Sequence, residues 1–133
     1  MAPENKFNFT HVTLIVSNFN NHVISWGTNG FDIRNQSIHS EETAWDRFVT
    51  LVHANRIPRR WLKKGVQLVN MALTKTFKLR MSRPCMRCSH LIEKYAHIIT
   101  NVTWTDTNGQ CCFSTANTIV QGSKWSSGDA RSL

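Results

Sequence analysis

The sequence predicts an α/β protein, an α+β arrangement in which a five-stranded mixed sheet is flanked by helices. Three observations lead to this fold class. Short β-branched, apolar runs alternate with segments whose apolar residues repeat with the period of a helix. An Asn-Gly pair in a five-residue connection predicts an antiparallel hairpin late in the chain. The length of 133 residues suits one sizeable core, so we expect a single domain over 1–120.

The first two strands are predicted to form a hairpin. Residues 9–16 are β-branched and apolar, as is typical of a strand, and residues 22–26 form a second run of this kind. A polar turn at 18–21 separates the two runs. The second strand is expected to end at the Gly-Thr-Asn-Gly segment of residues 27–30.

After residue 37 the period becomes that of a helix. One helical stripe, at positions i, i+4, i+7 and i+11, consists of Glu41, Trp45, Phe48 and Val52. This stripe directs Glu41 toward the core, whereas Glu42 is placed to interact with the helix dipole. A buried carboxylate needs a partner, and a metal-bound water is one that fits.

The middle of the chain combines basic and apolar segments. Residues 56–65 are expected to form a basic loop, and residues 66–73 a third strand that is followed by a basic stretch through Arg80. A second helix is predicted to open at the cysteine pair, with Pro84 in its first turn. Thiolates in a first turn gain from the positive end of the helix dipole, which lowers their pKa.

The last two strands are predicted over residues 98–105 and 111–118. They are expected to be antiparallel, because five intervening residues are too few for a parallel crossover. The Ser- and Gly-rich segment 121–133 is expected to be a mobile tail.

Two fragments carry the residues of a metal centre: His39-Ser40-Glu41 and Pro84-Cys85-Met86-Arg87-Cys88. One imidazole and two thiolates make three zinc ligands and leave a fourth tetrahedral position for water. The Glu41 carboxylate, which is separated from His39 by one residue, can move protons to and from that water. The alternatives are a closed structural zinc site, with Cys111 or Cys112 as fourth ligand, and a reduced cysteine pair without metal.

This H-x-E … P-C-x-x-C arrangement is the signature of the zinc nucleobase deaminases, and over residues 9–118 the chain resembles the cytidine deaminase superfamily. The resemblance implies a three-layer fold in which two helices present the zinc ligands from their N-termini. It implies that His39, Cys85 and Cys88 bind Zn²⁺ and that Glu41 is the proton shuttle. An antiparallel pair of strands four and five is typical of the branch that contains the nucleoside cytidine deaminases. In the tRNA adenosine deaminases, a helix intervenes there.

The resemblance also implies substrate contacts. Asn29 resembles the asparagine that contacts the nucleotide in several members, although it also fits a turn residue that tolerates positive φ. Trp26 is placed to stack on a base, with packing in the core as the alternative. Backbone groups near Ser82 and Arg83 are expected to orient the substrate's amino group.

Two departures from the family pattern matter. Most members carry a helix before the first strand, and only about ten residues precede it here, a count that depends on the predicted boundary. One face of the sheet is therefore expected to be uncovered, which suggests a homo-oligomer or a rearranged element. The glutamate that free-nucleoside deaminases carry near the Gly-x-Asn segment is missing, which argues against ribose recognition in a free nucleoside.

The net charge of +8 and the pI near 9.9 favour polyanionic partners. The cations cluster around Trp61, within residues 56–64, and along residues 75–87 toward the cysteines. These clusters predict either a phosphate-binding surface that leads to the metal or a solvated basic face.

No run of 18 apolar residues is present, so no membrane-spanning segment is expected, and the polar N-terminus lacks the core of a signal peptide. Four cysteines without an export signal favour a reducing, intracellular location, cytoplasmic or nuclear.

Four hypotheses follow. The first is a zinc-dependent hydrolase that deaminates cytosine to uracil in a nucleoside, nucleotide or single-stranded RNA or DNA. The second is an inactive nucleic-acid-binding module that keeps zinc for folding. The third is an adenine deaminase, which needs the same residues. The fourth is a deaminase of a non-nucleic aminopyrimidine compound.

Overall fold

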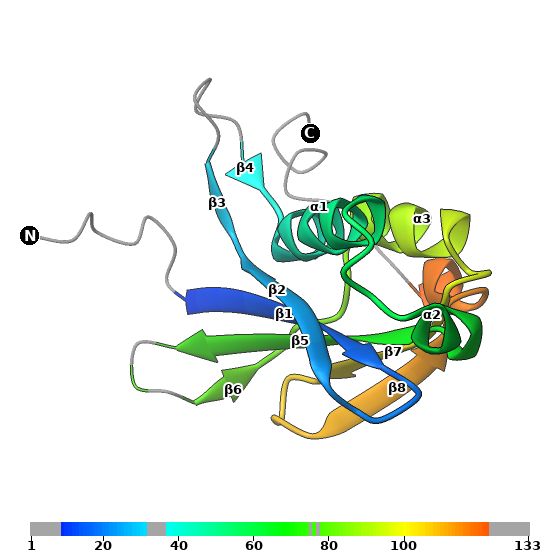
Figure 1. Ribbon diagram of the computed structural model, residues 1–133. Coiled ribbons are helices and arrows are strands. Elements are labelled where there is room, and N and C mark those ends of the chain that lie inside the picture. Colours follow the sequence, from blue (N-terminus) through cyan, green and yellow to red (C-terminus); the bar gives the residue numbers. More distant parts are fainter. Residues whose placement is uncertain (1–8, 32–36, 75, 77, 123–133) are drawn as a thin grey trace, which may run out of the picture.

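The computed structural model describes residues 9–31, 37–74, 76 and 78–122 (Figure 1). The predicted order of strand, strand, helix, strand, helix, strand, strand is confirmed, with short elements added between them. The bounds are β1 Phe9–Ser17, β2 Val23–Thr28, β3 Gly30–Phe31, β4 Ser37–Ile38, α1 Ser40–His53, α2 Arg59–Lys64, β5 Val66–Thr74, β6 Leu79–Arg80, α3 Met86–Lys94, β7 Ile99–Thr105, β8 Cys111–Thr115 and the 3-10 turn η1 Ile119–Gly122.

The main sheet has the strand order β2-β1-β5-β7-β8, and the short β6 also pairs with β5. Only β5 and β7 run parallel among these pairs, so the predicted mixed sheet is confirmed. Along the same edge, β5 pairs with β7 through Val69 and with β6 from Ala72. Asn70 therefore lies where β5 passes from one neighbour to the other.

The helices α1 and α3 pack on one face of this sheet (Figure 1). The core between them contains fully buried side chains from both layers: Ile15, Ala44, Phe48, Leu68, Ile92 and Val102. Gly27 allows β2 to approach α1 closely. A Cβ atom at this position would lie 2.5 Å from the backbone nitrogen of Ala44 and 2.7 Å from the carbonyl oxygen of Ser40. Residue 27 thus fixes how closely β2 can approach the first turn of α1.

The opposite face of the sheet carries no helix among the described residues (Figure 1). The strand registers place one row of side chains across this face, formed by Trp26, Leu14, Val69, Thr103 and Phe113. The ends of the row are open to solvent, since Trp26 is 52% exposed and Phe113 is 80% exposed. The expectation of an uncovered face holds for the described part of the chain.

Three local predictions are wrong. Residues 59–64 form α2 instead of a loop, because Pro58 supplies a suitable φ of −59° before good helix formers and Gly65 ends the helix at a φ of 80°. Pro84 lies before the first turn of α3, since Cys85 is the N-cap residue. The fifth strand ends at Thr115, because its partner β7 begins at Ile99 and offers little further backbone.

The predicted tail of residues 121–133 lies outside the described residues from 123 onward, and its first two residues end η1. The short connections also differ from expectation. The basic stretch that follows β5 includes β6, which pairs through Leu79 and Arg80. In the described ranges, none of the helices is long and apolar enough to cross a membrane.

Candidate active site

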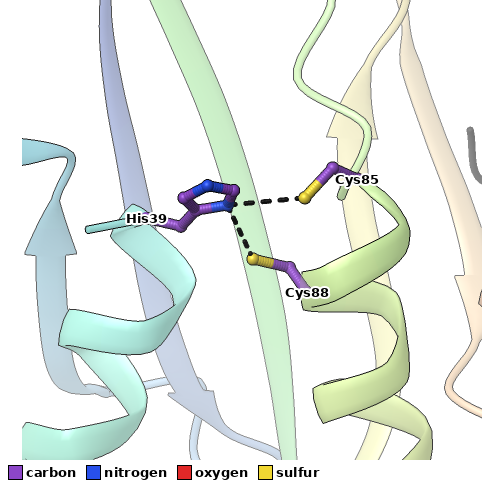
Figure 2. A group of neighbouring side chains, drawn as sticks. All are labelled: His39, Cys85 and Cys88. Atoms are coloured by element: carbon purple, nitrogen blue, oxygen red, sulfur yellow. Dashed lines mark hydrogen bonds between the residues drawn. The ribbon is translucent and has the colours of Figure 1, made fainter. Parts of the chain in front are cut away.

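The starts of two helices bring His39, Cys85 and Cys88 together (Figure 2). The Nδ1 atom of His39 lies 3.1 Å from the Cys88 sulfur and 3.4 Å from the Cys85 sulfur. All three ligand atoms lie within 4.8 Å of one another. A tetrahedral zinc ion with ordinary Zn–N and Zn–S distances separates nitrogen from sulfur by about 3.5 Å. The three side chains therefore fit one zinc ion after small adjustments.

No fourth protein ligand joins this group in the part of the chain that the structure describes. Cys111 is exposed on β8, and the sulfur of Cys112 is directed to the carbonyl oxygen of Gln110 at 3.8 Å. Neither cysteine forms the closed structural site considered above. A metal ion bound here would keep one coordination position open, as catalytic zinc sites do.

The three side chains shift one another's proton affinities. The pKa of Cys85 is lowered to about 4, chiefly because the Cys88 thiol donates a hydrogen bond to its sulfur, with a further contribution from His39. The same hydrogen bond and burial raise the pKa of Cys88. The hydrogen bond to Cys85 raises the pKa of His39. A thiolate is thus already present in the metal-free site, and metal capture displaces the remaining thiol proton.

Glu41 lies in the first turn of α1 and is only 6% exposed, as the helical stripe predicted. The Ser40 hydroxyl donates to its Oε1 at 2.9 Å, and the Asn70 side-chain amide donates to its Oε2 at 3.1 Å. Asn70 is itself held by the Thr13 hydroxyl, which donates to the amide oxygen at 2.6 Å. Contacts from α1, β1 and β5 therefore orient the carboxylate.

No protein-family model matches the sequence, and no curated protein is similar to it in sequence. Solved structures do match. The crystal structure of cytidine deaminase from Burkholderia pseudomallei aligns with a TM-score of 0.58 at 17% identity, over 87% of this chain and 82% of that chain. The apo dCMP deaminase from cyanophage S-TIM5 aligns with a TM-score of 0.50 at 14% identity, over 86% of this chain and 77% of that chain.

The chain has a cytidine deaminase-like fold. Within this deaminase-like fold, α1 and α3 bring His39, Cys85 and Cys88 together at their N-terminal ends, as the resemblance implied. The antiparallel pairing of β7 with β8 confirms the predicted hairpin.

Ser82 contacts Asn70, which lies between the part of β5 that pairs with β7 and the part that pairs with β6. Its hydroxyl donates to the Asn70 carbonyl at 3.0 Å, and its backbone nitrogen donates to the Thr105 carbonyl at 2.8 Å. The Ser82 carbonyl and the Glu41 carboxylate both accept from the Asn70 amide. This shared donor places the Ser82 backbone next to the Glu41 carboxylate.

The side chain of Arg83 contacts η1 and β7. Its guanidinium donates to the Ile119 carbonyl at 2.9 Å and lies 4.6 Å from the centre of the Trp104 ring. These contacts fasten η1 to the domain. The Nε atom of Arg83 is buried without a hydrogen-bond partner among the described residues.

Asn29 lies immediately after β2, beside the end of β1. Its side-chain oxygen accepts from the backbone nitrogen of His11 at 3.1 Å, while its Nδ2 atom is buried without a partner among the described residues. The positive-φ alternative is wrong, because the described non-glycine residues with positive φ are Asn21 and Asn55. A buried donor without an acceptor is compatible with a ligand contact.

Trp26 does not join this cluster. It lies on the uncovered face of β2, where the Arg47 guanidinium sits 4.9 Å from its ring centre and donates to its carbonyl oxygen at 2.8 Å. An open surface hollow of about 440 Å³ borders it. Trp26 is therefore not packed in the core, since half of its surface is exposed.

The sequence reasoning missed the residues that orient Glu41, namely Thr13 and Asn70, and it missed His11 on the same face of β1. Burial chiefly lowers the pKa of His11, which also interacts electrostatically with Glu41 and His39. A signal existed for Asn70, because an amide on the buried side of an apolar strand needs hydrogen-bond partners. The sequence did not indicate which partners these are.

Proposed function

We propose that this protein is a zinc-dependent hydrolytic deaminase that converts cytosine to uracil in a nucleoside, nucleotide or single-stranded nucleic acid. The observation that carries the proposal is a buried, doubly hydrogen-bonded Glu41 at the helix start that also bears the His39 ligand. The similar solved structures are a cytidine deaminase and a dCMP deaminase, which supports a cytosine-containing substrate.

His39, Cys85 and Cys88 would hold the zinc ion, which at such a site lowers the pKa of a bound water to near neutrality. Glu41 takes a proton from the attacking water while the water oxygen bonds to C4 of the ring. Glu41 then returns that proton to N3. Glu41 next carries the second proton of that water, now on the C4 hydroxyl, to the amino group, which leaves as ammonia. The balance is cytosine plus water giving uracil plus ammonia, with no change of oxidation state.

Neighbouring residues support these transfers. Ser40 and Asn70 hold the carboxylate in one orientation, so that little reorganisation is needed when the proton moves. The Ser82 carbonyl, which already accepts from the Asn70 amide, is the acceptor we assign to the substrate's amino group. The buried Nδ2 of Asn29 is the donor we assign to the sugar or base.

The pairing of β7 with β8 favours cytosine over adenine. The two strands are antiparallel from Asn101–Thr115 to Thr105–Cys111 and are joined by a tight turn. Among resembling proteins, this arrangement is typical of the nucleoside cytidine deaminases, whereas the tRNA adenosine deaminases have a helix at this point. The preference for cytosine therefore rests on the likeness of this strand pair to one of the two groups of deaminases.

The test measures bound metal and released product together. Purified protein should carry one zinc per chain and release ammonia from at least one of cytidine, dCMP, single-stranded DNA and RNA. Glu41→Gln should keep the zinc and lower the rate by about 10²- to 10⁴-fold, the usual contribution of a general acid–base residue. Glu93→Gln, at an exposed position of α3, is the matched control and should change neither.

Each other outcome has a defined meaning. Uracil formation at an undiminished rate by Glu41→Gln would remove the proposed mechanism. Zinc-loaded protein that binds single strands but deaminates none of the substrates would be the inactive nucleic-acid-binding module. Conversion of adenosine to inosine would make the protein an adenine deaminase.

A further inference from the structure

A basic surface lies at the end of the sheet where β5 begins. We call it the α2 surface, and its members are Phe19, His22, Arg59, Arg60, Lys63 and Lys64. Five of the nine residues from Arg56 to Lys64 are Arg or Lys. Trp61 and Leu62 pack against the hydrophobic core, while all four cations of α2 are exposed. The helix therefore turns its positive charge outward as one group.

This charge is not neutralised by neighbouring carboxylates. Among the described residues, the single ion pair is the one between Arg87 and Glu42, on the first turns of α3 and α1. The cations of α2 thus have no carboxylate within ion-pair distance in this part of the chain. Closely spaced, unpaired cations repel one another, and a polyanion that binds them relieves this repulsion and releases its own counterions.

Aromatic rings lie among the cations. Phe19 is 45% exposed, and its ring lies 6.5 Å from that of Trp61 at an interplanar angle of 19°. The guanidinium of Arg60 lies 5.4 Å from the centre of the Phe19 ring. His22, also exposed, meets Trp61 edge-on at 5.9 Å. An exposed ring among cations offers a stacking platform for an unpaired base beside sites for phosphates.

Hydrogen bonds join the turn that carries Phe19 to α2 and to the sheet. The side-chain amide of Asn18 donates to the Lys64 carbonyl at 3.1 Å and to the Thr100 hydroxyl at 2.8 Å. The backbone nitrogen of Asn18 donates to the carbonyl of Gly65, the residue that ends α2. These bonds join the β1–β2 turn to the helix, so less ordering is needed when a ligand binds.

The α2 surface is separate from the candidate active site. Val66 pairs with Ser17, whereas Asn70, which holds Glu41, pairs with Thr13. The stretch from Val66 to Asn70 spans roughly 13 Å at about 3.3 Å per residue. The α2 surface lies beyond the Val66 end, so a ligand bound there leaves the metal-binding group open.

We infer that the α2 surface binds single-stranded nucleic acid, through phosphate contacts to α2 and base stacking on Phe19. The exposed ring favours single strands over duplexes, whose bases already stack on one another. A lipid surface fits less well, because the apolar side chains of α2 are used in the core. The inference goes beyond the proposed function and does not depend on chemistry at Glu41.

The first experiment separates this surface from general positive charge. Binding of a fluorescent thymidine 20-mer, which contains no cytosine, is followed by anisotropy as the salt concentration rises. Lys63→Glu should weaken binding about tenfold and reduce the slope of log K against log salt by about 0.7 or more, the value for one lost single-strand phosphate contact. Lys78→Glu is the matched control, since Lys78 is equally charged and exposed but lies beyond the other end of β5. Equal losses for the two variants would overturn the inference.

The second experiment tests stacking. Phe19→Leu should weaken binding about tenfold because it removes the ring and keeps an apolar side chain, whereas Phe19→Tyr should bind as the wild type does. Zinc content and melting temperature check that each variant is folded. Glu41→Gln should bind the 20-mer normally, which separates this result from the fate of the proposed deaminase activity.

Two further arms complete the design. A duplex of the same length should bind at least several-fold more weakly, and duplex binding as tight as single-strand binding would overturn the role of Phe19. Vesicles of phosphatidylcholine and phosphatidylserine should not compete with the 20-mer at matched charge. Preferential binding to the vesicles would make the α2 surface a lipid-binding site and would overturn the inference.

Discussion

The Glu42 carboxylate and the Arg87 guanidinium form an ion pair that joins the first turns of α1 and α3. The Arg87 terminal nitrogen lies 2.7 Å from Oε2 of Glu42, and its Nε donates to the same oxygen at 3.1 Å. Oε1 of Glu42 also accepts from the backbone nitrogen of His39 at 3.0 Å. One carboxylate thus caps the helix that follows His39 and fixes it to the helix that carries the cysteines.

Arg87→Ala should therefore loosen the metal-binding group. We expect zinc affinity to fall by about 3- to 10-fold, the low end for groups that orient metal ligands, because the ion pair is partly exposed to solvent. Competition with a chromophoric chelator measures this change. Lys94→Ala, which removes a charge from the other end of α3, should leave affinity unchanged. An Arg87→Ala protein with wild-type affinity would show that the ion pair does not position the ligands.

Gly27→Ala should destabilise the domain strongly. Its Cβ atom would meet backbone atoms of Ser40 and Ala44, which move only if α1 shifts on the sheet. We expect the free energy of unfolding to drop by about 3 kcal/mol, at the upper end for overpacking. Urea denaturation measures the loss. Gly30→Ala is the control, since nothing lies within 4 Å of its added Cβ, and equal stability of the two variants would contradict the packing argument.

Asn70→Ala should lower activity without removing zinc. The substitution deletes the donor to Glu41 Oε2 and removes the amide oxygen that accepts from the Thr13 hydroxyl. We expect kcat to fall by about 10- to 100-fold, and the pH dependence of kcat to shift, because Asn70 acts through the orientation and hydrogen bonding of Glu41. Asn101→Ala, at an exposed position of β7, should change neither quantity. A rate loss with an unmoved pH profile would assign Asn70 a structural role only.

Cys85 should react at acidic pH in the metal-free protein. Its pKa is lowered to about 4, so the nucleophilic thiolate persists as the pH falls from 8 to 5 and is lost only near pH 4. Cys88, whose pKa is raised, should stay unmodified. Iodoacetamide labelling followed by peptide mass spectrometry measures both, and zinc should protect Cys85. Labelling of Cys85 that drops tenfold per pH unit between 8 and 6 would contradict the lowered pKa.

The shared helix start of Cys85 and Cys88 and the burial of Glu41 could be predicted from the sequence because both depend on local spacing. Cys85 and Cys88 share one helix start, and Glu41 follows His39 by two positions. The hairpins were predictable for the same reason, since each depends on a short turn. Local pattern was sufficient wherever neighbours in the chain are also neighbours in space.

The support of Glu41 could not be predicted, because it depends on register between distant strands. Thr13 meets Asn70 only because β1 pairs with β5 across 57 positions of sequence. A shift of two residues in that pairing would break the contact while leaving every side chain on its own face. The two-residue strands β3, β4 and β6 were missed because so short a segment has no period.

The row that ends in Trp26 and Phe113 has a practical consequence for handling the protein. It contains no ionisable side chain, while the whole molecule carries a net charge of +8. Mutual repulsion keeps copies apart in dilute buffer, and added salt screens that repulsion within about 10 Å at 0.1 M. Light scattering should therefore report growing particles as sodium chloride is raised, so concentrated samples are best stored at low ionic strength.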